Sequence, residues 1–228
     1  FLEIFRSIHT LVEEKALRHI KSGDCILTYG RSSSIELILQ HAVTTGLHIR
    51  VIVVDCGPLY EGKTFAARLQ SLGIPVTYGL LTAICSLLPS CNKVMIGASA
   101  VLQSGEVYSR AGTATVATAA KAFRKPVLCM CESHKFVPKV WIGSLVQNSE
   151  VGDLQQRRPV GVQSQNINVH VDQATKPWPQ REQNPSGYLY DLTPASAVDM
   201  VICEMGCLST SGIAAAIRDR QDRELFMQ

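Results

Sequence analysis

Short, uninterrupted runs of apolar residues recur along the chain, and longer segments with helical spacing separate them. The clearest runs are CILTY (25–29), IRVIVVD (49–55) and PVLCMC (126–131). Strands that are buried on both faces have this continuous apolar pattern, and parallel strands need long, usually helical, connections. The sequence therefore predicts an α/β fold in which a parallel sheet is covered by helices on both faces.

The expected elements alternate as far as residue 131 and resume near the C-terminus. Strands are predicted at 25–29, 49–55, 76–78, 93–96, 126–131 and 200–204, and helices at 35–45, 64–72, 82–88, 113–123, 195–199 and 213–227. We expect Thr193 to N-cap the helix at 195–199, with Pro194 as its first residue. Residues 97–113 are predicted to be a loop that leads from a strand into an alanine-rich helix.

The two ends of the chain and one polar segment suggest a domain organisation. Residues 1–22 carry apolar side chains at helical intervals, and we expect them to be the end of an N-terminal helical region. Residues 23–228 then form one main domain. Within it, residues 152–187 are rich in Gln, Asn, Arg and Pro and predict a long polar excursion. The chain starts at Phe1 and not at Met, which favours a fragment of a longer protein.

Composition excludes several classes of function. The net charge is only +3 and there is no basic run, which argues against nucleic acid binding. No apolar run reaches the ~20 residues that a membrane span needs. The eight cysteines include no CxxC pair, so we expect reduced thiols in a cytoplasmic protein and no metal site. With 46% hydrophobic and 18% charged residues, the chain is predicted to bury apolar surface in an oligomer.

Four loops follow the carboxyl ends of predicted strands, and such loops converge at one edge of a parallel sheet. In the first, Arg31, Ser32 and Ser33 either cradle a phosphate or form a serine N-cap with a surface arginine. In the second, Asp55 either binds sugar hydroxyls or accepts hydrogen bonds from backbone N–H groups. In the fourth, residues 132–135, His134 is a catalytic candidate without a visible nucleophile, so a polar loop is the better interpretation.

The third loop, residues 97–113, reads as an anion pocket without acid–base chemistry. It contains glycines, hydroxyls such as Ser99, and one cation, Arg110. Glu106 is its only acidic residue, and it has no His or Cys. Arg110, Gly112 and Thr113 stand just before a predicted helix, where backbone N–H groups favour anions, although a glycine turn with a surface arginine fits the same residues. Residues 57–64, GPLYEGKT, have the GxxxxGK[ST] spacing, and the chain has no GxGxxG motif. No nucleotide cofactor is predicted.

Three longer motifs carry a family resemblance. They are GASAVLQSGEVYSRAGTA (97–114), YDLTP (190–194) and VICEMG (201–206). Over about residues 25–206 the chain resembles the family that contains methylthioribose-1-phosphate isomerase, ribose-1,5-bisphosphate isomerase and the regulatory subunits of translation initiation factor 2B. Within that family it is most similar to the delta subunits. The resemblance implies a Rossmann-like fold.

The resemblance also suggests that the two residues essential to the isomerases are missing. Gly30 stands where those enzymes have a catalytic cysteine, and Ser99 where they have a catalytic aspartate. Aldose–ketose isomerisation needs an acid–base pair, which glycine and serine do not supply. Gly57-Pro58 replaces an arginine-proline step of the initiation factor subunits. The interpretation is a vestigial anion or ligand pocket with no catalytic residue, formed by Arg31, Ser32, Ser33, Asp55, Ser99, Arg110, Gly112 and Thr113.

The function that the resemblance implies is that of a non-catalytic regulatory subunit. Factor 2B is the guanine-nucleotide exchange factor for initiation factor 2, and its regulatory core senses initiation factor 2 phosphorylated on its alpha subunit. The expected partners are the beta subunit, other factor 2B subunits and phosphorylated initiation factor 2, with a homodimer in isolation. Two alternatives stay open: a sugar-phosphate isomerase with unusual residues, and a non-catalytic sensor of sugar phosphates or nucleotides.

Overall fold

The computed structural model describes residues 2–57, 59–140 and 189–226. A seven-stranded sheet forms its centre, with the strands in the spatial order β11-β10-β7-β4-β1-β2-β3. Every neighbouring pair is parallel except β10 and β11, which are antiparallel. The strands are β1 (Cys25–Tyr29), β2 (Arg50–Asp55), β3 (Val76–Leu80), β4 (Lys93–Gly97), β7 (Val127–Met130), β10 (Met200–Cys203) and β11 (Gly206–Leu208). The predicted parallel sheet is confirmed, and β11 is an addition that the sequence pattern did not indicate.

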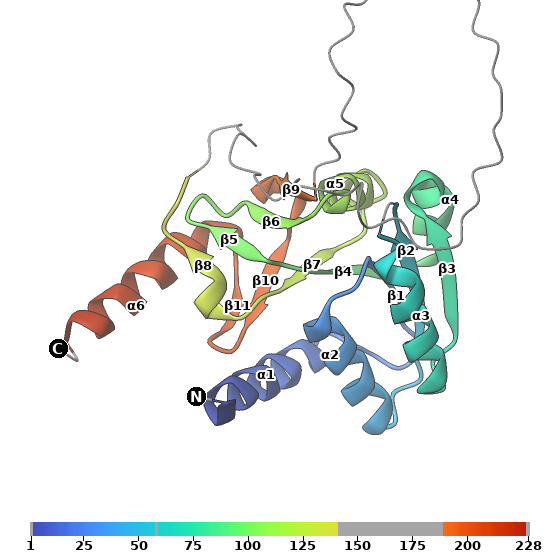
Figure 1. Cartoon of the computed structure of the whole chain (residues 1–228), viewed down its shortest axis with the longest axis horizontal. Helices are drawn as coiled ribbons and strands as arrows, with labels where there is room; N and C mark the ends of the chain where they lie inside the picture. Colours follow the sequence, from blue (N-terminus) through green and yellow to red (C-terminus); the bar gives the residue numbers. More distant parts are fainter. Residues whose placement is uncertain (1, 58, 141–188, 227–228) are drawn as a thin grey trace, which may run out of the picture.

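Helices cover both faces of this sheet, as predicted (Figure 1). On one face lie α1 (Leu2–Leu17), α2 (Ser33–Thr44) and α3 (Glu61–Ser71), and on the other lie α4 (Ile84–Leu87), α5 (Thr113–Ala122) and the start of α6 (Ile213–Phe226). Successive residues of a strand point to opposite faces. Ile26 therefore packs with the α1–α3 core, while Leu27 packs with the α4–α6 core.

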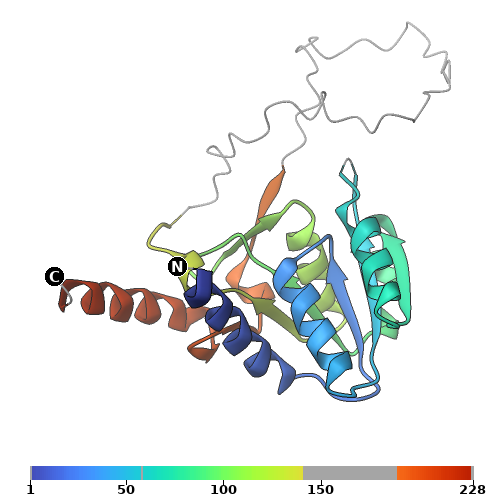
Figure 2. The same cartoon turned by 60° about the horizontal axis from the view of Figure 1, so that its bottom comes forward.

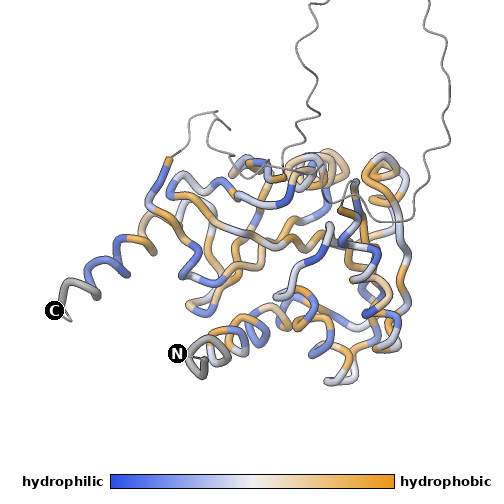
Figure 3. The backbone as a smooth tube through the Cα atoms, viewed as in Figure 1, coloured by the Kyte–Doolittle hydropathy of each residue, from blue (hydrophilic) through white to orange (hydrophobic). Residues whose placement is uncertain are grey.

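The turned view in Figure 2 shows α1, α2 and α3 side by side, with α6 extending from the body of the molecule. Hydrophobic residues concentrate in the central strands, while α6 becomes hydrophilic beyond its first turns (Figure 3). Only Ile213 and Ile217 of α6 belong to the buried core among the described side chains. None of the described helices is both long and apolar enough to cross a membrane.

A second sheet corrects the prediction that residues 97–113 form a loop. It has the order β8-β5-β6-β9 and consists of β5 (Ala100–Leu102), β6 (Val107–Arg110), β8 (Phe136–Val137) and β9 (Tyr190–Thr193). In β6 buried and half-buried residues alternate, as in a strand with one face on the core. The glycines and the short length of this segment concealed the alternation. Its long-range partner β9 lies about 80 positions later in the chain.

Two local expectations also change. Thr193 does not cap a helix: it belongs to β9, and the segment predicted as a helix at 195–199 is a short 3₁₀ turn, Ala195–Ala197, that follows Pro194 without a side-chain cap. The helix predicted at 82–88 contains one turn of α-helix, α4, between two 3₁₀ turns.

The polar excursion predicted at 152–187 lies outside the described residues. The proposed boundary near residue 22 stays a prediction, although Val12 and Ala16 of α1 are buried in the core of the main sheet.

Candidate functional site

Two adjoining cavities open where β1, β2 and β4 end. We call them the larger cavity, of about 310 Å³, and the smaller cavity, of about 50 Å³. The larger cavity is lined by five of the predicted site residues: Arg31, Ser32, Ser33, Ser99 and Arg110. Asp55 lines the smaller cavity, and Arg110 lines both. The structure thus brings six of the eight predicted residues to one edge of the sheet, while Gly112 and Thr113 line neither cavity.

The turn from β1 into α2 positions the first group of residues. Ser32 is the N-cap of α2, and its Oγ accepts a hydrogen bond of 3.5 Å from the backbone N–H of Ile35. A Cβ on Gly97 would lie only 2.4 Å from the Ser32 Oγ, so glycine lets the end of β4 approach this turn. Arg31 forms an ion pair with Glu36 at 3.5 Å. The serine N-cap alternative therefore describes Ser32 correctly, and the same turn also faces the larger cavity.

Asp55 is held by the start of α3. Its carboxylate accepts hydrogen bonds from the backbone N–H groups of Cys56 (2.9 Å) and Lys63 (3.1 Å) and from the hydroxyl of Tyr78 (3.0 Å). Burial and the hydrogen bond to Asp55 raise the pKa of Tyr78 to about 12. A Cβ on Gly62 would lie 2.8 Å from the Asp55 Cγ, so the first turn of α3 rests directly on this carboxylate. Of the two interpretations of Asp55, acceptance of hydrogen bonds from backbone N–H groups is therefore the one that the structure shows.

Arg110, at the end of β6, is the central cation of the site. It donates two hydrogen bonds to Glu61, from Nε to Oε2 at 2.9 Å and from Nη2 to Oε1 at 3.0 Å. Its guanidinium lies over the ring of Tyr190, 5.0 Å from the centroid, and Tyr190 stacks on Tyr108. Its Nη1 is buried and has no hydrogen-bond partner among the described residues. Glu61 was not among the predicted site residues, because no local motif joins residues 49 positions apart.

The N-terminus of α5 is occupied by Asp191. One oxygen of the Asp191 carboxylate accepts hydrogen bonds from the backbone N–H groups of Gly112 (2.6 Å) and Ala114 (3.1 Å). Burial raises the pKa of Asp191, and these two hydrogen bonds oppose the rise. The hydroxyl of Thr113 donates a hydrogen bond of 2.6 Å to the backbone carbonyl of Arg110. The backbone donors that the sequence suggested for a bound anion are thus taken by a side chain of the same protein. The YDLTP motif contains Asp191, but nothing in it indicates the capping role.

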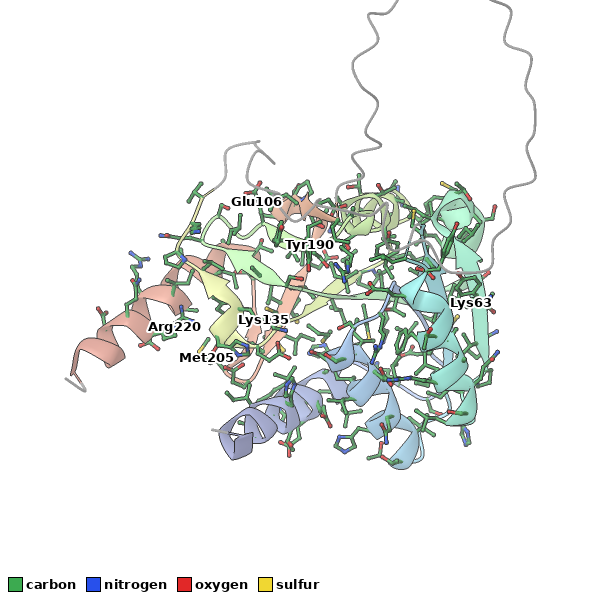
Figure 4. The ribbon with its side chains drawn as sticks, in the orientation of Figure 1. Lys63, Glu106, Lys135, Tyr190, Met205 and Arg220 are labelled. Atoms are coloured by element: carbon green, nitrogen blue, oxygen red, sulfur yellow. The ribbon has the colours of Figure 1, made fainter. Side chains whose placement is uncertain are left out.

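A buried carboxylate, Glu132, follows β7 beneath the larger cavity. It accepts a hydrogen bond from the hydroxyl of Ser34 at 2.7 Å and pairs with Lys135 at 2.5 Å and with His9 of α1 at 3.2 Å. Burial alone would raise the pKa of Glu132, but the hydrogen bonds from Lys135 and Ser34 outweigh it and hold the pKa below its usual value. Lys135, labelled in Figure 4, follows β7. It also lines the larger cavity, whereas His134, the catalytic candidate, does not.

Gly30 and Ser99, the residues that the family resemblance places at the isomerases' catalytic positions, line the two cavities. Gly30 lines the smaller cavity with φ +60, and a Cβ there would meet no atom within 4 Å. Ser99 lines the larger cavity. Tyr29 lines both cavities. Burial chiefly raises its pKa well above the usual value, and its hydroxyl donates a hydrogen bond of 2.5 Å to the carbonyl of Ala111.

The lining therefore offers many hydroxyl groups, the two guanidinium groups of Arg31 and Arg110, and the ammonium group of Lys135. Its carboxylates among the described residues, Asp55 and Glu61, are both held by other partners. Such a lining suits the binding of a polar ligand better than the transfer of protons. Within residues 2–57, 59–140 and 189–226, no three His, Cys, Asp or Glu side chains gather closely enough to hold a metal ion.

Comparison with known proteins gives a consistent set of relatives. The model of the initiation factor 2 subunit family matches residues 2–210. The chain is 33% identical over 224 residues to translation initiation factor eIF2B subunit delta of Dictyostelium discoideum, covering 96% of this chain and 35% of that protein. It is 31% identical over 199 residues to ribose 1,5-bisphosphate isomerase of Thermococcus kodakarensis, covering 86% of this chain and 57% of that enzyme.

Solved structures point the same way. A chain of the tetrameric eIF2B-beta2-delta2 complex from C. thermophilum superposes with a TM-score of 0.68 at 27% identity, over 87% of this chain and 56% of that chain. The chain thus spans between about a third and three fifths of the length of these relatives. The expected resemblance, fold class and similarity to delta subunits are confirmed.

Proposed function

Because the chain belongs to the initiation factor 2 subunit family, we propose that it serves as a regulatory, delta-type subunit of the exchange factor for translation initiation factor 2. The observation that carries this proposal is the identity of 33% to a delta subunit over 96% of the chain. The exchange reaction itself belongs to other subunits in this proposal. The chain contributes a surface for assembly and a share in sensing phosphorylated initiation factor 2.

The proposal includes the absence of isomerase activity. Moving a proton between neighbouring carbons of a sugar phosphate needs an acid and a base near the substrate. Gly30 and Ser99 stand at the positions that the family resemblance assigns to the catalytic thiol and carboxylate. Purified protein is incubated with ribose 1,5-bisphosphate and with methylthioribose 1-phosphate. The proposal expects no product above background, and turnover with either compound contradicts it in favour of the enzyme alternative.

The proposed partners are the beta subunit, the remaining factor 2B subunits and phosphorylated initiation factor 2, all in the cytoplasm. One structural relative is a beta2-delta2 tetramer by its description, which supports a beta-type partner for this chain. The full-length tagged protein is co-expressed with the beta subunit and purified through the tag. Recovery of a stoichiometric complex supports the assignment, and a chain that associates with no factor 2B subunit overturns it. In isolation we expect a homodimer, which light scattering on a sizing column measures.

A second candidate function is a ligand sensor that keeps a pocket without the chemistry. The observations in its favour are the larger cavity, which Arg110 lines, and the Arg110 Nη1, which is buried without a hydrogen-bond partner among the described residues. Its ligand site consists of Arg31, Ser32, Ser33, Ser99 and Arg110. Asp55 lines the adjoining smaller cavity, and Gly112 and Thr113 stand at the start of α5. Calorimetric titration with a panel of sugar phosphates and nucleotides tests this candidate. Binding that Arg110→Ala abolishes supports it, and no heat across the panel counts against it.

A further inference from the structure

The cations of the larger cavity are neutralised from within the protein. Three cationic side chains line it among the described residues: Arg31, Arg110 and Lys135. Each of them lies within 3.5 Å of a glutamate, in the pairs Arg31–Glu36, Arg110–Glu61 and Lys135–Glu132. A phosphate group that enters this cavity therefore meets positive charges that are already matched by carboxylates, which weakens its attraction.

The three pairs differ in how firmly their carboxylates are fixed. Glu132 is fully buried and has further contacts with Ser34 and His9, so it is part of the core. Glu36 is shared between Arg31 and Arg68, and the Arg31 side chain is 41% exposed. Such an exposed, shared pair is weak.

Glu61 is neither fully buried like Glu132 nor shared between two arginines like Glu36. It is in the first turn of α3, its side chain is 35% exposed, and it lines the smaller cavity next to Arg110. It takes two of the donor positions of the guanidinium, Nε and Nη2, in the paired geometry that a phosphate group also prefers. The remaining nitrogen, Nη1, is buried without a partner among the described residues. Because Nη1 is buried and Glu61 holds Nε and Nη2, an anion that binds this guanidinium has to compete with Glu61.

We propose that Glu61 is an internal anion that occupies Arg110 and so weakens the binding of phosphate groups in the larger cavity until it is displaced. The proposal rests on the cavity being a binding site, the second candidate function above. It adds that the site is closed by the protein's own carboxylate, which has to leave Arg110 before a phosphate ester binds tightly. Glu61 thereby sets the specificity of the cavity against small phosphates.

The test uses inorganic phosphate as the probe, with calorimetry or NMR titration of the full-length chain. Glu61→Gln keeps the size of the side chain and removes its charge, and we expect it to bind phosphate about tenfold more tightly than the native chain. The double variant Glu61→Gln with Arg110→Gln loses this gain. The matched control is Glu106→Gln, which removes one negative charge from the turn between β5 and β6, outside the lining of the cavity (Figure 4). It leaves phosphate affinity unchanged.

Two results overturn the proposal. One is a Glu61→Gln variant that is folded, by its circular dichroism and urea midpoint, yet binds phosphate no more tightly than the native chain. The other is an equal gain in Glu106→Gln, which reports overall charge and not the pair. Neither result affects the regulatory assignment, because co-purification with the beta subunit tests that separately. Native protein that already binds phosphate as tightly as Glu61→Gln supports a pocket but contradicts closure by Glu61.

Discussion

The carboxylate of Asp191 accepts a 2.6 Å hydrogen bond from the backbone N–H of Gly112. This contact joins β9 to the start of α5, two segments about 80 residues apart in sequence. The N-terminal N–H groups of a helix need acceptors, and a carboxylate there also interacts favourably with the helix dipole. The glycine–helix arrangement that looks like an anion site in the sequence is therefore, in the fold, a site for an internal anion.

We expect Asp191→Ala to lower the free energy of unfolding by about 1–2 kcal/mol, because two backbone N–H groups lose their acceptor. Asp191→Asn keeps one acceptor oxygen and serves as the matched variant, with a smaller loss. Urea denaturation followed by circular dichroism measures both. Equal stability of Asp191→Ala and the native chain contradicts the capping role.

The pH dependence of this site has a definite sign. Burial raises the folded-state pKa of Asp191 above its usual value. The folded state then binds the proton more tightly than the unfolded state, so the contribution of Asp191 to stability is largest at low pH and falls as pH rises through the folded-state pKa. The native chain should therefore gain stability relative to Asp191→Asn as the pH is lowered from 7 towards 4. A difference that is constant with pH, or that grows in the opposite direction, contradicts this.

Gly112 should not tolerate a side chain. Its φ is +105, and a Cβ would lie 2.1 Å from the hydroxyl oxygen of Tyr29. We expect Gly112→Ala to cost about 3 kcal/mol or more, from the backbone strain and the clash together. Gly46→Ala is the control, since Gly46 also has a positive φ, +84, but open space around its Cβ position. It should cost only about 1 kcal/mol. Similar urea midpoints for the two variants would show that the contact with Tyr29 is not tight.

The sequence predicts those parts of the fold in which the local pattern and the final environment agree. β1 was predicted with its exact bounds, because all five of its residues are buried and its apolar run is uninterrupted. β5 and β6 are not predicted, because they have only three and four residues, AVL and VYSR, and their strand character depends on pairing with each other and on the pairing of β6 with β9. Thr193 was assigned to a cap for the same reason: its local sequence favours a cap, but pairing with Val107 makes it part of a strand.

The candidate site shows the same limit. Ligands bind at the carboxyl ends of parallel strands, and this rule predicts that Arg31, Ser99 and Arg110 lie close together. In the structure all three line the larger cavity. Two carboxylates are not among the predicted site residues: Glu61, which pairs with Arg110, and Asp191, which caps α5. Glu61 lies on a helix that follows a different strand, and Asp191 lies on β9. Motifs identify the donors of a pocket more readily than the distant groups that neutralise them.

Glu132 should stabilise the protein with the opposite pH dependence to Asp191. Glu132→Gln leaves Lys135 without its counter-charge and weakens the contacts to Ser34 and His9, so we expect a loss of about 2 kcal/mol near pH 7. Because the folded-state pKa of Glu132 is lowered, its contribution is present above the unfolded-state pKa and is lost as pH falls through the folded-state pKa. The difference in stability between the native chain and Glu132→Gln should therefore shrink below about pH 4.5.

The control for Glu132 is Glu36→Gln, which removes a glutamate that is paired with the more exposed Arg31 and Arg68. Exposed pairs contribute about 1 kcal/mol or less. Urea midpoints between pH 7 and pH 4 measure both variants. If Glu36→Gln costs as much as Glu132→Gln, burial is not the reason that Glu132 matters.

The eight thiols should fall into two classes of reactivity. Cys56, Cys85 and Cys207 are exposed, and the other five are buried: Cys25, Cys91, Cys129, Cys131 and Cys203. Burial raises the pKa of Cys91 to about 11 and of Cys129 to about 12, so these buried thiols are rarely ionised near pH 8. A chromogenic disulfide reagent at pH 8 should therefore label three thiols rapidly in the native chain and all eight in denaturant. Each of the single variants Cys56→Ser, Cys85→Ser and Cys207→Ser should remove one equivalent of the rapid phase. If the rapid phase exceeds three equivalents, the packing of β1, β7 and β10 is contradicted, because those strands carry buried thiols. If the rapid phase is smaller than three equivalents, another surface covers an exposed cysteine.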